Sequence, residues 1–458
     1  MKTFRAYQPT QTLLLPPSIE EWLPEGHLAR FVREVAATLD LTAIENTYKE
    51  ERGNPPYHPR MMVTVLLYAY STGTYSSRRM GSKLVDDVAY RFLAAGNVPD
   101  FRTLSDFRKT HGVALSGLFV QVLKLCAEAG LVKLGRVAVD GTKVKANASK
   151  HKAMSYARMN EREAALQAQV AELLARAEAT DKAEDAEYGE DRRGDELPEE
   201  LQRAEGRLAK IQAAKAALEA QAREQAMKDA EDAKAHIAER EQKEKENGRR
   251  FGGKRPQVPD PEQAKPAPKA QRNFTDPESR IQKTADGFIQ GYTAVLAVDD
   301  VAQVIVAQHV TANGPEQNEL IPIVNEMARL MGRLPDQLVA DAGYWSEANA
   351  EHLSAKGIDG YLARGRMKHS ESAPAPPRGR IPAKLSVAER MERKLKTKAG
   401  RAVYARRKAI VEPVNGQIKQ ARGFRQFLRR GVERVGQEWS LVCTAHNLLK
   451  LRVTWEPA

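Results

Sequence analysis

Three acidic residues stand at positions where carboxylates can gather into one site. Asp140 ends an apolar run directly before a glycine, and Asp341 ends a second apolar run two residues before a glycine. Glu412 lies in a basic stretch, because residues 393–434 contain fourteen Lys or Arg but only two acids. Taken singly, each acid has a simpler explanation. A strand-terminal Asp before Gly is typical of a turn, and Glu412 can pair with Lys408 one helical turn earlier.

The order of the elements around these acids indicates how they come together. The predicted elements begin with a strand ending on Asp140 (135–141), an antiparallel strand pair (291–299 and 304–310) and a helix (316–331). They continue with a strand ending on Asp341 (337–343), a helix (346–356), a strand (359–363) and a helical region from 387 onward that carries Glu412. This is the element order of the ribonuclease H-like fold, an α/β fold with a mixed sheet and flanking helices. If the strands of Asp140 and Asp341 are parallel neighbours, their carboxylates meet at one edge of the sheet. Glu412 can join them from a helix packed beside it.

Three unpaired carboxylates in one place repel one another and raise one another's pKa. Divalent cations relieve this repulsion, and Mg²⁺ prefers hard oxygen ligands while keeping positions open for phosphate oxygens. Two such ions about 4 Å apart can activate water or a 3′-hydroxyl for phosphoryl transfer. The sequence therefore predicts a site for two Mg²⁺ or Mn²⁺ ions at Asp140, Asp341 and Glu412.

Residues 1–130 predict an all-α domain that precedes this core. Apolar residues recur at helical spacing and predict helices over 27–40, 61–70 and 112–129. Thr103 and Asp106 have the spacing of a capping box. Basic residues stand in the turns and at the helix starts, a layout that fits a helix-turn-helix and equally a plain helical scaffold.

Residues 151–272 interrupt the α/β core. Their first part, 151–250, is rich in Ala, Glu, Lys, Gln and Arg and predicts a helical hairpin or antiparallel coiled coil with an acidic break at 181–200. A solvated, partly disordered charged segment is the alternative. Residues 251–272 are rich in Pro, Gly and Lys and predict a linker. The predicted domains are therefore 1–130, 131–150 together with 273–458, and 151–272.

The chain of 458 residues carries 72 Lys and Arg against 60 Asp and Glu, a net charge of +12. This surplus favours a polyanionic partner, nucleic acid before membrane, although a protein that is basic only for solubility is the alternative. Cys126 and Cys443 lie in apolar helical patterns and predict buried free thiols, which fits a reducing compartment. Without an apolar signal core or a run of 18 apolar residues in the sequence, we expect a cytoplasmic protein with no membrane partner.

Several motifs match one known family. They are Tyr57-His-Pro-Arg-Met-Met, Val137-Ala-Val-Asp140-Gly-Thr-Lys, Gly291-Tyr-Thr-Ala-Val, Val339-Ala-Asp341-Ala-Gly-Tyr344, Ile410-Val-Glu412-Pro-Val-Asn-Gly-Gln-Ile-Lys419 and Trp439-Ser-Leu-Val-Cys-Thr-Ala-His446-Asn447. Through these motifs the chain resembles the DDE transposases of bacterial insertion sequences that have a helical N-terminal domain. The resemblance covers nearly the whole chain and is weakest over 151–280. The resemblance implies that Asp140, Asp341 and Glu412 are the catalytic, metal-binding triad. It implies DNA strand cleavage at the ends of the element and transfer of the freed 3′-hydroxyl into target DNA.

The resemblance also implies partners and a location. The expected partner is double-stranded DNA, both as terminal inverted repeats, which the helical domain would bind, and as target. Because two element ends must be cut and joined together, we expect a homo-oligomer, at least a dimer on DNA. The helices of 151–250 would serve this assembly or clamp DNA. The protein would be cytoplasmic and associated with the nucleoid when bound.

A related signature contains Tyr, Arg, Glu and Lys, separated by two, three and six residues. Tyr404, Arg407, Glu412 and Lys419 match it except that four residues separate Arg407 from Glu412, and Lys408 has the expected offset. The spacing therefore favours Lys408 over Arg407, and Lys419 would hold a phosphate oxygen as a point charge. Further candidates for DNA contact continue the same region: Arg422, Arg425, Arg429 and Arg430.

Two other residues have a functional and a structural interpretation. Trp345 could stack on a flipped base, but a large aromatic residue at a helix start more often packs into the core. His446 lies in an apolar helix, which favours a packed histidine over a ligand.

Three other functions fit parts of the sequence. A DNA-binding regulator or catalytically inactive transposase relic would keep the basic surfaces, but the presence of all three acids argues against it. A metal-dependent DNA nuclease would cleave without strand transfer. A coiled-coil structural protein is suggested by 151–250 alone and would be helical throughout.

Overall fold

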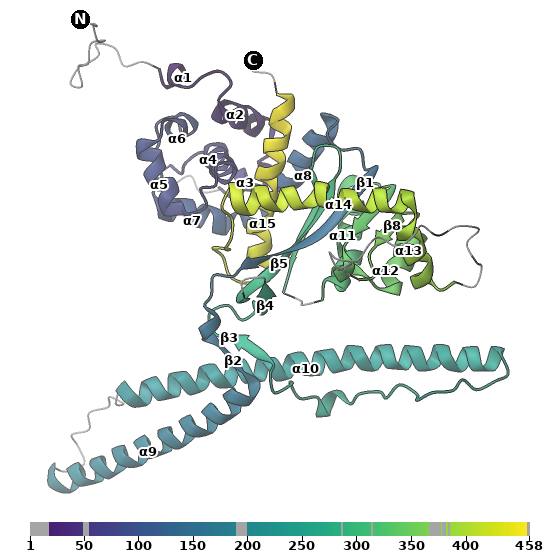
Figure 1. Ribbon diagram of the computed structural model, residues 1–458. Helices are drawn as coiled ribbons and strands as arrows, with labels where there is room; N and C mark the ends of the chain where they lie inside the picture. The colour runs from purple at the N-terminus through teal and green to yellow at the C-terminus, as the bar shows by residue number, and fades with distance from the viewer. Residues whose placement is uncertain are drawn as a thin grey trace, which may run out of the picture. The chain divides into compact units, whose positions relative to one another are not determined.

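We describe the protein from a computed structural model (Figure 1). The chain forms two compact units, one comprising Met1–Lys145 with Tyr292–Ala458 and the other Ala146–Gly291. The structure describes residues 18–48, 55–188, 199–284, 287–312, 315–365, 377, 382 and 385–455.

The first unit starts with helices, as predicted. Those that precede its first strand in the described ranges are α1 (Ile19–Trp22), α2 (Leu28–Thr38), α3 (Thr42–Glu45), α4 (Pro59–Ser71), α5 (Ser77–Asp86), α6 (Val88–Leu93), α7 (Phe101–Thr110) and α8 (Gly112–Glu128) (Figure 1). The helices predicted over 27–40, 61–70 and 112–129 are confirmed as α2, α4 and α8. Residues 62–71 of α4 are all buried, which explains why this helix is apolar nearly all round.

Helix α7 has a different N-cap from the predicted one. The Asp100 carboxylate accepts hydrogen bonds from the backbone N–H groups of Arg102 and Thr103, the latter at 3.0 Å. Because an acid at the N-cap satisfies these otherwise unpaired donors, the helix begins at Phe101. The predicted capping box of Thr103 with Asp106 is therefore wrong, since both residues lie inside the helix.

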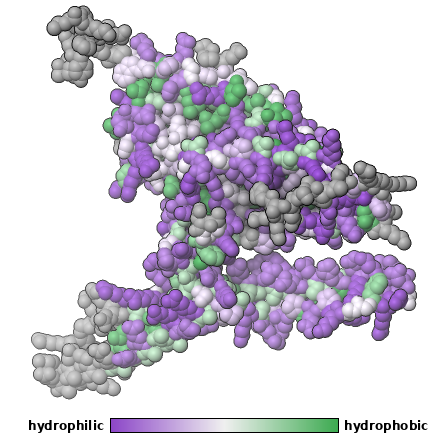
Figure 2. Space-filling model, in the orientation of Figure 1, coloured by the Kyte–Doolittle hydropathy of each residue, from purple (hydrophilic) through white to green (hydrophobic). Residues whose placement is uncertain are grey.

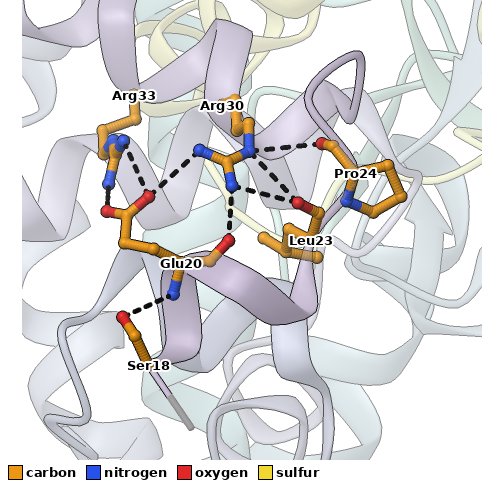
Figure 3. A network of polar contacts seen from close by, with 6 residues as sticks. All are labelled: Ser18, Glu20, Leu23, Pro24, Arg30 and Arg33. Atoms are coloured by element: carbon orange, nitrogen blue, oxygen red, sulfur yellow. Dashed lines mark hydrogen bonds and ion pairs between the residues drawn. The ribbon is translucent and has the colours of Figure 1, made fainter.

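A polar network joins α1 to α2 (Figure 3). Arg30 donates to the Glu20 carboxylate at 3.0 Å and to the backbone oxygens of Leu23 at 3.0 Å and Pro24 at 3.2 Å. Arg33, nearly one turn further along α2, also pairs with Glu20. Exposed ion pairs contribute little by themselves, about 0–1 kcal/mol. The Arg30 guanidinium instead satisfies carbonyl groups at the end of α1 that have no helical partner.

A mixed sheet forms the α/β part of the first unit. Its strands are β1 (Arg136–Lys145), β5 (Gly287–Asp299), which enters from the second unit, β6 (Ile305–Thr311), β7 (Gln337–Ala340) and β8 (Asp359–Leu362), in the spatial order β6-β5-β1-β7-β8. β7 pairs in parallel with β1 and β8, and β5 forms the predicted antiparallel hairpin with β6. Residues 290–299 of β5 are all buried, as expected for an internal strand that carries a continuous apolar run.

The remaining helices of the first unit are η3 (Glu316–Glu319), α11 (Leu320–Met331), η4 (Ala342–Tyr344), α12 (Glu347–Ala355), α13 (Val387–Lys396), α14 (Lys398–Gly416), the π-helix η5 (Gln417–Ala421), α15 (Val432–Leu451) and η6 (Arg452–Thr454). The predicted helix over 316–331 thus begins with a 3₁₀ turn. Thr397 separates α13 from α14 and caps α14 through its hydroxyl. Pro413 lies inside α14, and the widened π-helical turn follows four residues later.

Helix α15 packs against α4, α8 and β6 and so joins the helical part of the first unit to its sheet. Its buried polar side chains find partners across that interface. The Asn447 amide accepts from Ile305 N and donates to Ile305 O, both at 2.9 Å. His446 Nε2 bonds to Gln303 O at 2.9 Å, and burial lowers the pKa of His446 to about 3. The predicted packed histidine is therefore confirmed.

The second unit contains the predicted helical hairpin. Its helices are α9 (Tyr156–Tyr188) and α10 (Glu199–Glu246). Tyr156 donates to Glu219 at 2.7 Å, and Lys215 donates to Glu163 at 2.8 Å. The later residue on α9, Glu163, pairs with the earlier residue on α10, Lys215, so the two helices run antiparallel.

An apolar seam holds the two helices together. Met159 and Leu166 of α9 pack with Ile211, Ala214 and Leu218 of α10. The surface of the hairpin is mainly hydrophilic (Figure 2), as its composition requires. Residues 189–198, part of the predicted acidic break, lie outside the described residues.

Residues 251–272, predicted as a linker, run back along α10. Arg240 of α10 donates to Phe251 O and Gly252 O, and Arg255 pairs with Glu241 at 3.4 Å. The short helix η2 (Pro261–Gln263) also contacts α10. The second unit is completed by η1 (Lys150–Lys152), by β2 (Ala153–Ser155) paired with β3 (Gln271–Asn273), and by β4 (Arg280–Thr284) paired with residues 287–291.

The two cysteines are free and buried, as predicted. Cys126 Sγ lies 3.5 Å from Asn447 O in the α8–α15 interface. Within the described ranges no single helix is long and apolar enough to cross a membrane, and only α7 and α8 together, bent by 76°, reach that length and composition.

The segment that follows η5 is attached to the end of β1. Lys145 N donates to Arg425 O at 3.2 Å, and Phe427 N donates to Lys145 O at 2.8 Å. Phe424 and Phe427 pack on the fully buried Trp439, with ring centroids 6.0 and 6.3 Å from it. Trp439 thus holds this segment beside the strand that carries Asp140.

Replacing Trp439 by Ala should destabilise the first unit by about 3–5 kcal/mol, because a large cavity would remain under Phe424 and Phe427. The measurement is thermal or urea unfolding followed by circular dichroism. Val453→Ala, at a side chain that is 84% exposed, is the control and should change little. A loss below about 1 kcal/mol for W439A would contradict this role.

Candidate active site

The parallel pairing of β1 with β7 brings Asp140 and Asp341 to one edge of the sheet. Val139 lies opposite Ala340, so the two Asp residues follow paired positions. The predicted adjacency of these strands is confirmed. The prediction that the first strand ends at Asp140 is wrong, because β1 continues to Lys145, where it pairs with the segment after η5. Asp341 does end its strand and caps η4 by accepting from Gly343 N at 2.9 Å.

Asp140 is the most enclosed of the three acids. Its side chain is 19% exposed. The pKa of Asp140 is raised to about 7, mainly by burial; the Arg407 charge opposes this rise, and the charges of Asp341 and Glu316 contribute to it. The side chain of Asn415 donates to Asp140 Oδ2 at 3.1 Å. Asp140 therefore depends on neighbouring donors and cations to keep its charge.

Arg407 lies between Asp140 and Glu412. One guanidinium nitrogen is 3.9 Å from Asp140 Oδ1 and the other is 3.6 Å from Glu412 Oε1. The Arg407 side chain is only 12% exposed, whereas that of Glu412 is 52% exposed. Glu412 is thus linked to Asp140 through a shared arginine.

Of Arg407 and Lys408, it is Arg407 that lies against the acids. Arg407 precedes the buried Ile410 and Val411 by three and four residues, so it lies on the face of α14 that packs inward. Lys408 is exposed. The extra residue before Glu412 therefore does not move the arginine out of the site.

Tyr404 and Lys419 also lie near the acids. Burial raises the pKa of Tyr404, and the charges of Asp341 and Asp140 act on its phenol in the same direction. Lys419 Nζ donates to Lys143 O at 2.7 Å. Burial lowers the pKa of Lys419, and the nearby Asp140 charge opposes this. Lys419 thus comes to the site although it lies on η5 and not on the regular helix that was predicted.

The four later arginines divide into two kinds. Arg422 contacts His446 Nδ1 at 3.2 Å, and Arg429 donates to Gln437 at 3.0 Å and to the backbone oxygen of Arg108 at 3.0 Å. Burial lowers the pKa of both arginines. Arg425 and Arg430 are exposed. Only the second pair therefore presents its charge at the surface.

Two neighbours of Asp140 were missed at the level of sequence. Asn415 lies in the motif that was quoted around Glu412, and its offset of three residues places it one turn further along α14. Glu316 stands at the first turn of a predicted helix, where an acid is normally explained by the helix dipole. Only the tertiary structure brings Glu316 to Asp140.

Among the described residues, no group of three Asp, Glu, His or Cys side chains is arranged to hold a metal ion. Arg407 lies between Asp140 and Glu412, and one oxygen of Asp341 is bonded to Gly343. The donor set nevertheless suits a hard divalent cation, because the groups gathered here are carboxylates and the most buried one has a raised pKa. A cation would favour the ionised form of Asp140.

Two family models match parts of the chain. Residues 17–110 match a transposase domain (DUF772), and residues 379–452 match a transposase DDE domain. The two matches support a DDE transposase. No curated protein and no solved structure gives a significant match.

The two matched segments lie in different parts of the chain. The DDE match includes α13–α15 and with them Tyr404, Arg407, Glu412 and Lys419. Neither match includes Asp140 or Asp341, so their place in the site depends on the sheet geometry. DDE transposases typically use divalent metal ions.

Asp140→Asn should stabilise the metal-free protein. The pKa of Asp140 in the folded chain lies above its ordinary value of 3.8, so the ionised carboxylate destabilises the fold. That cost is absent below about pH 4, grows with pH and is complete above about pH 7. A shift of this size corresponds to at most about 4 kcal/mol. Urea unfolding in EDTA should therefore show D140N more stable than wild type at pH 8, with the difference shrinking by pH 5.

Asp106→Asn, on an exposed position of α7, is the control and should show no such pH-dependent gain. A D140N protein that is less stable than wild type at pH 8 would show that the bonds to Arg407 and Asn415 outweigh the cost of burying the charge.

Proposed function

We propose that the chain is the transposase of a bacterial insertion sequence. It would cleave DNA strands at the ends of the element and use the freed 3′-hydroxyl to attack target DNA. The observation that carries this proposal is the meeting of Asp140 and Asp341 at the ends of paired positions of β1 and β7, with Arg407 of α14 lying between Asp140 and Glu412. Two segments of the same chain match transposase domains.

The strand order supports a ribonuclease H-like core. An antiparallel hairpin lies on one side of β1, and two strands that run parallel to β1 lie on the other, in the order β6-β5-β1-β7-β8. The ribonuclease H-like fold has the same strand arrangement, which supports the proposal. The division into a helical domain over 1–130, a core over 131–150 and 273–458, and an insertion over 151–272 is proposed on the same grounds.

Asp140, Asp341 and Glu412 would hold two Mg²⁺ or Mn²⁺ ions. When bound, such ions supply an activated water or 3′-hydroxyl and stabilise the leaving oxygen in phosphoryl transfer. Arg407 would move from the acids to a DNA phosphate, for which its planar guanidinium is suited. Lys419 would meet a further phosphate oxygen as a point charge.

The spacing of Tyr404, Arg407, Glu412 and Lys419 makes this a variant of the Tyr-Arg-Glu-Lys signature with one added residue. Tyr404, Arg407 and Lys419 lie within the electrostatic reach of Asp140, which supports a common role.

The DNA interface would be built from exposed cations around this site. We propose that Lys408, Arg425 and Arg430 contact phosphates directly. Arg422 and Arg429, which are partly buried and bond within the protein, would act by holding the same segment in place.

The remaining parts would serve DNA binding and assembly. The N-terminal helices would bind the terminal inverted repeats, and the hairpin of α9 and α10 would clamp DNA or join protomers. Because two ends are processed together, the active form would be at least a dimer on DNA. The protein would act in the bacterial cytoplasm, at the nucleoid.

Replacing any one of Asp140, Asp341 or Glu412 by Ala should reduce strand cleavage to background while DNA binding persists. The reason is that each carboxylate acts on the reaction and not on the duplex. Cleavage would be measured on labelled DNA that contains the inverted repeats flanking the reading frame, and binding by electrophoretic mobility shift. Glu433→Ala, which removes the other acid of the 393–434 stretch, is the matched control and should cleave normally. Normal cleavage by one of the three variants would remove that residue from the site.

A strand-transfer assay with pre-cleaved ends separates the transposase from a metal-dependent nuclease. Joined products support the transposase, and cleavage without joining supports the nuclease. An absence of both activities with retained binding would point to an inactive DNA-binding relic.

Binding to DNA should weaken steeply with salt, because phosphate contacts release counterions. Arg425→Ala and Arg430→Ala should each lower the slope of log affinity against log salt by about 1. Fluorescence anisotropy at several salt concentrations measures this slope. Arg329→Ala, on α11 beside Glu326, should leave it unchanged. An identical slope in all variants would place the DNA elsewhere.

A further inference from the structure

A fourth carboxylate is directed into the candidate active site from η3. A methyl group placed on Gly343 would overlap Glu316 Oε2, and one placed on Gly141 would lie 3.5 Å from Glu316 Oε1. Gly141 follows Asp140 directly, and Gly343 follows Asp341 by two residues. The two glycines therefore leave room for the Glu316 carboxylate beside both strand acids.

The segment that carries Glu316 is held in place by buried polar groups. Asn349 of α12 donates to Gln317 O at 2.7 Å and to Tyr344 O at 2.8 Å, and so ties η3 to η4. His309 of β6 contacts the Glu319 carboxylate at 2.7 Å and anchors the other end of η3. Glu316 is thus presented by a braced turn.

A buried hydroxyl without a partner faces the same place. Tyr344 is fully buried, and within the described part of the chain its hydroxyl has no hydrogen-bond partner. That hydroxyl lies 3.1 Å from the methyl position on Gly141 that also faces Glu316. The charges of Asp140, Glu316 and Asp341 all act on it. Buried hydroxyls normally find a partner, so this one marks a place where a ligand or its bound water belongs.

We infer that Glu316 is a fourth acid of the metal site, binding a divalent cation together with Asp140 and Asp341. The inference rests on the proposed function. Glu412 is 52% exposed and lies against Arg407. Glu316 instead lies close to Gly141 and Gly343, the glycines that follow Asp140 and Asp341. Charge favours the assignment, because two divalent cations carry four positive charges and four carboxylates balance them.

The test is Mn²⁺ binding to the full-length protein without DNA, measured by electron paramagnetic resonance and by isothermal titration calorimetry. Glu316→Gln removes one charge at nearly constant shape and should weaken Mn²⁺ binding by about tenfold or more. Glu316→Asp keeps a carboxylate and should bind more tightly than E316Q. Glu326→Gln, on α11 and paired with Arg329, is the matched control and should bind like wild type.

Asp140→Asn, measured beside these variants, separates the two proposals. If D140N weakens Mn²⁺ binding and E316Q does not, Glu316 is not a ligand and the proposed site stands without it. If D140N leaves Mn²⁺ binding unchanged, the metal site of the proposed function is itself overturned. If E316Q and E316D weaken binding equally and both lower the melting temperature in EDTA, Glu316 has only a structural role and the inference fails.

Discussion

A carboxylate on an internal strand is the constraint on which the rest of the first unit depends. Asp140 lies on β1 between β5 and β7, where water cannot fully solvate its charge. The compensation comes from one helix, because Arg407 and Asn415 both belong to α14. Helix α14 must therefore pack on the sheet in one orientation about its own axis, with Arg407 and Asn415 facing Asp140. Glu412 is carried to the same edge as a consequence.

The turn between β5 and β6 also holds that helix, at a residue between Arg407 and Asn415. Gln303 donates to Ala409 O of α14 at 3.0 Å and accepts from Lys450 of α15 at 3.0 Å, while its backbone oxygen bonds to His446. One residue thus connects the sheet, the helix of Glu412 and the helix that packs on the N-terminal domain. The helical start of the chain and the acids therefore belong to one compact unit.

Periodicity predicted the elements well and their ends less well. Helices α2, α4 and α8, the β5–β6 hairpin and the two Asp strands follow from local apolar spacing. The errors lie where a long-range or capping bond decides the boundary. β1 extends past Asp140 because its end pairs with residues 425–427, and α7 starts at Phe101 because Asp100 caps it. The linker prediction did not foresee that Arg240 of α10 bonds to residues 251 and 252 and that Arg255 pairs with Glu241 of α10.

The same limit applies to the candidate site. The residue types in the sequence were informative there, but the sequence did not show which way each side chain points. Spacing identified three acids, yet it favoured Lys408 over Arg407, because spacing does not show which face of α14 is buried. Glu316 carries no local signal, since it reaches Asp140 only through the packing of η3 on η4. The basic stretch overstates the positive charge at the surface, because Arg407, Arg422 and Arg429 bond to groups within the protein. Net charge therefore indicates the class of partner, and only burial indicates which cations can reach it.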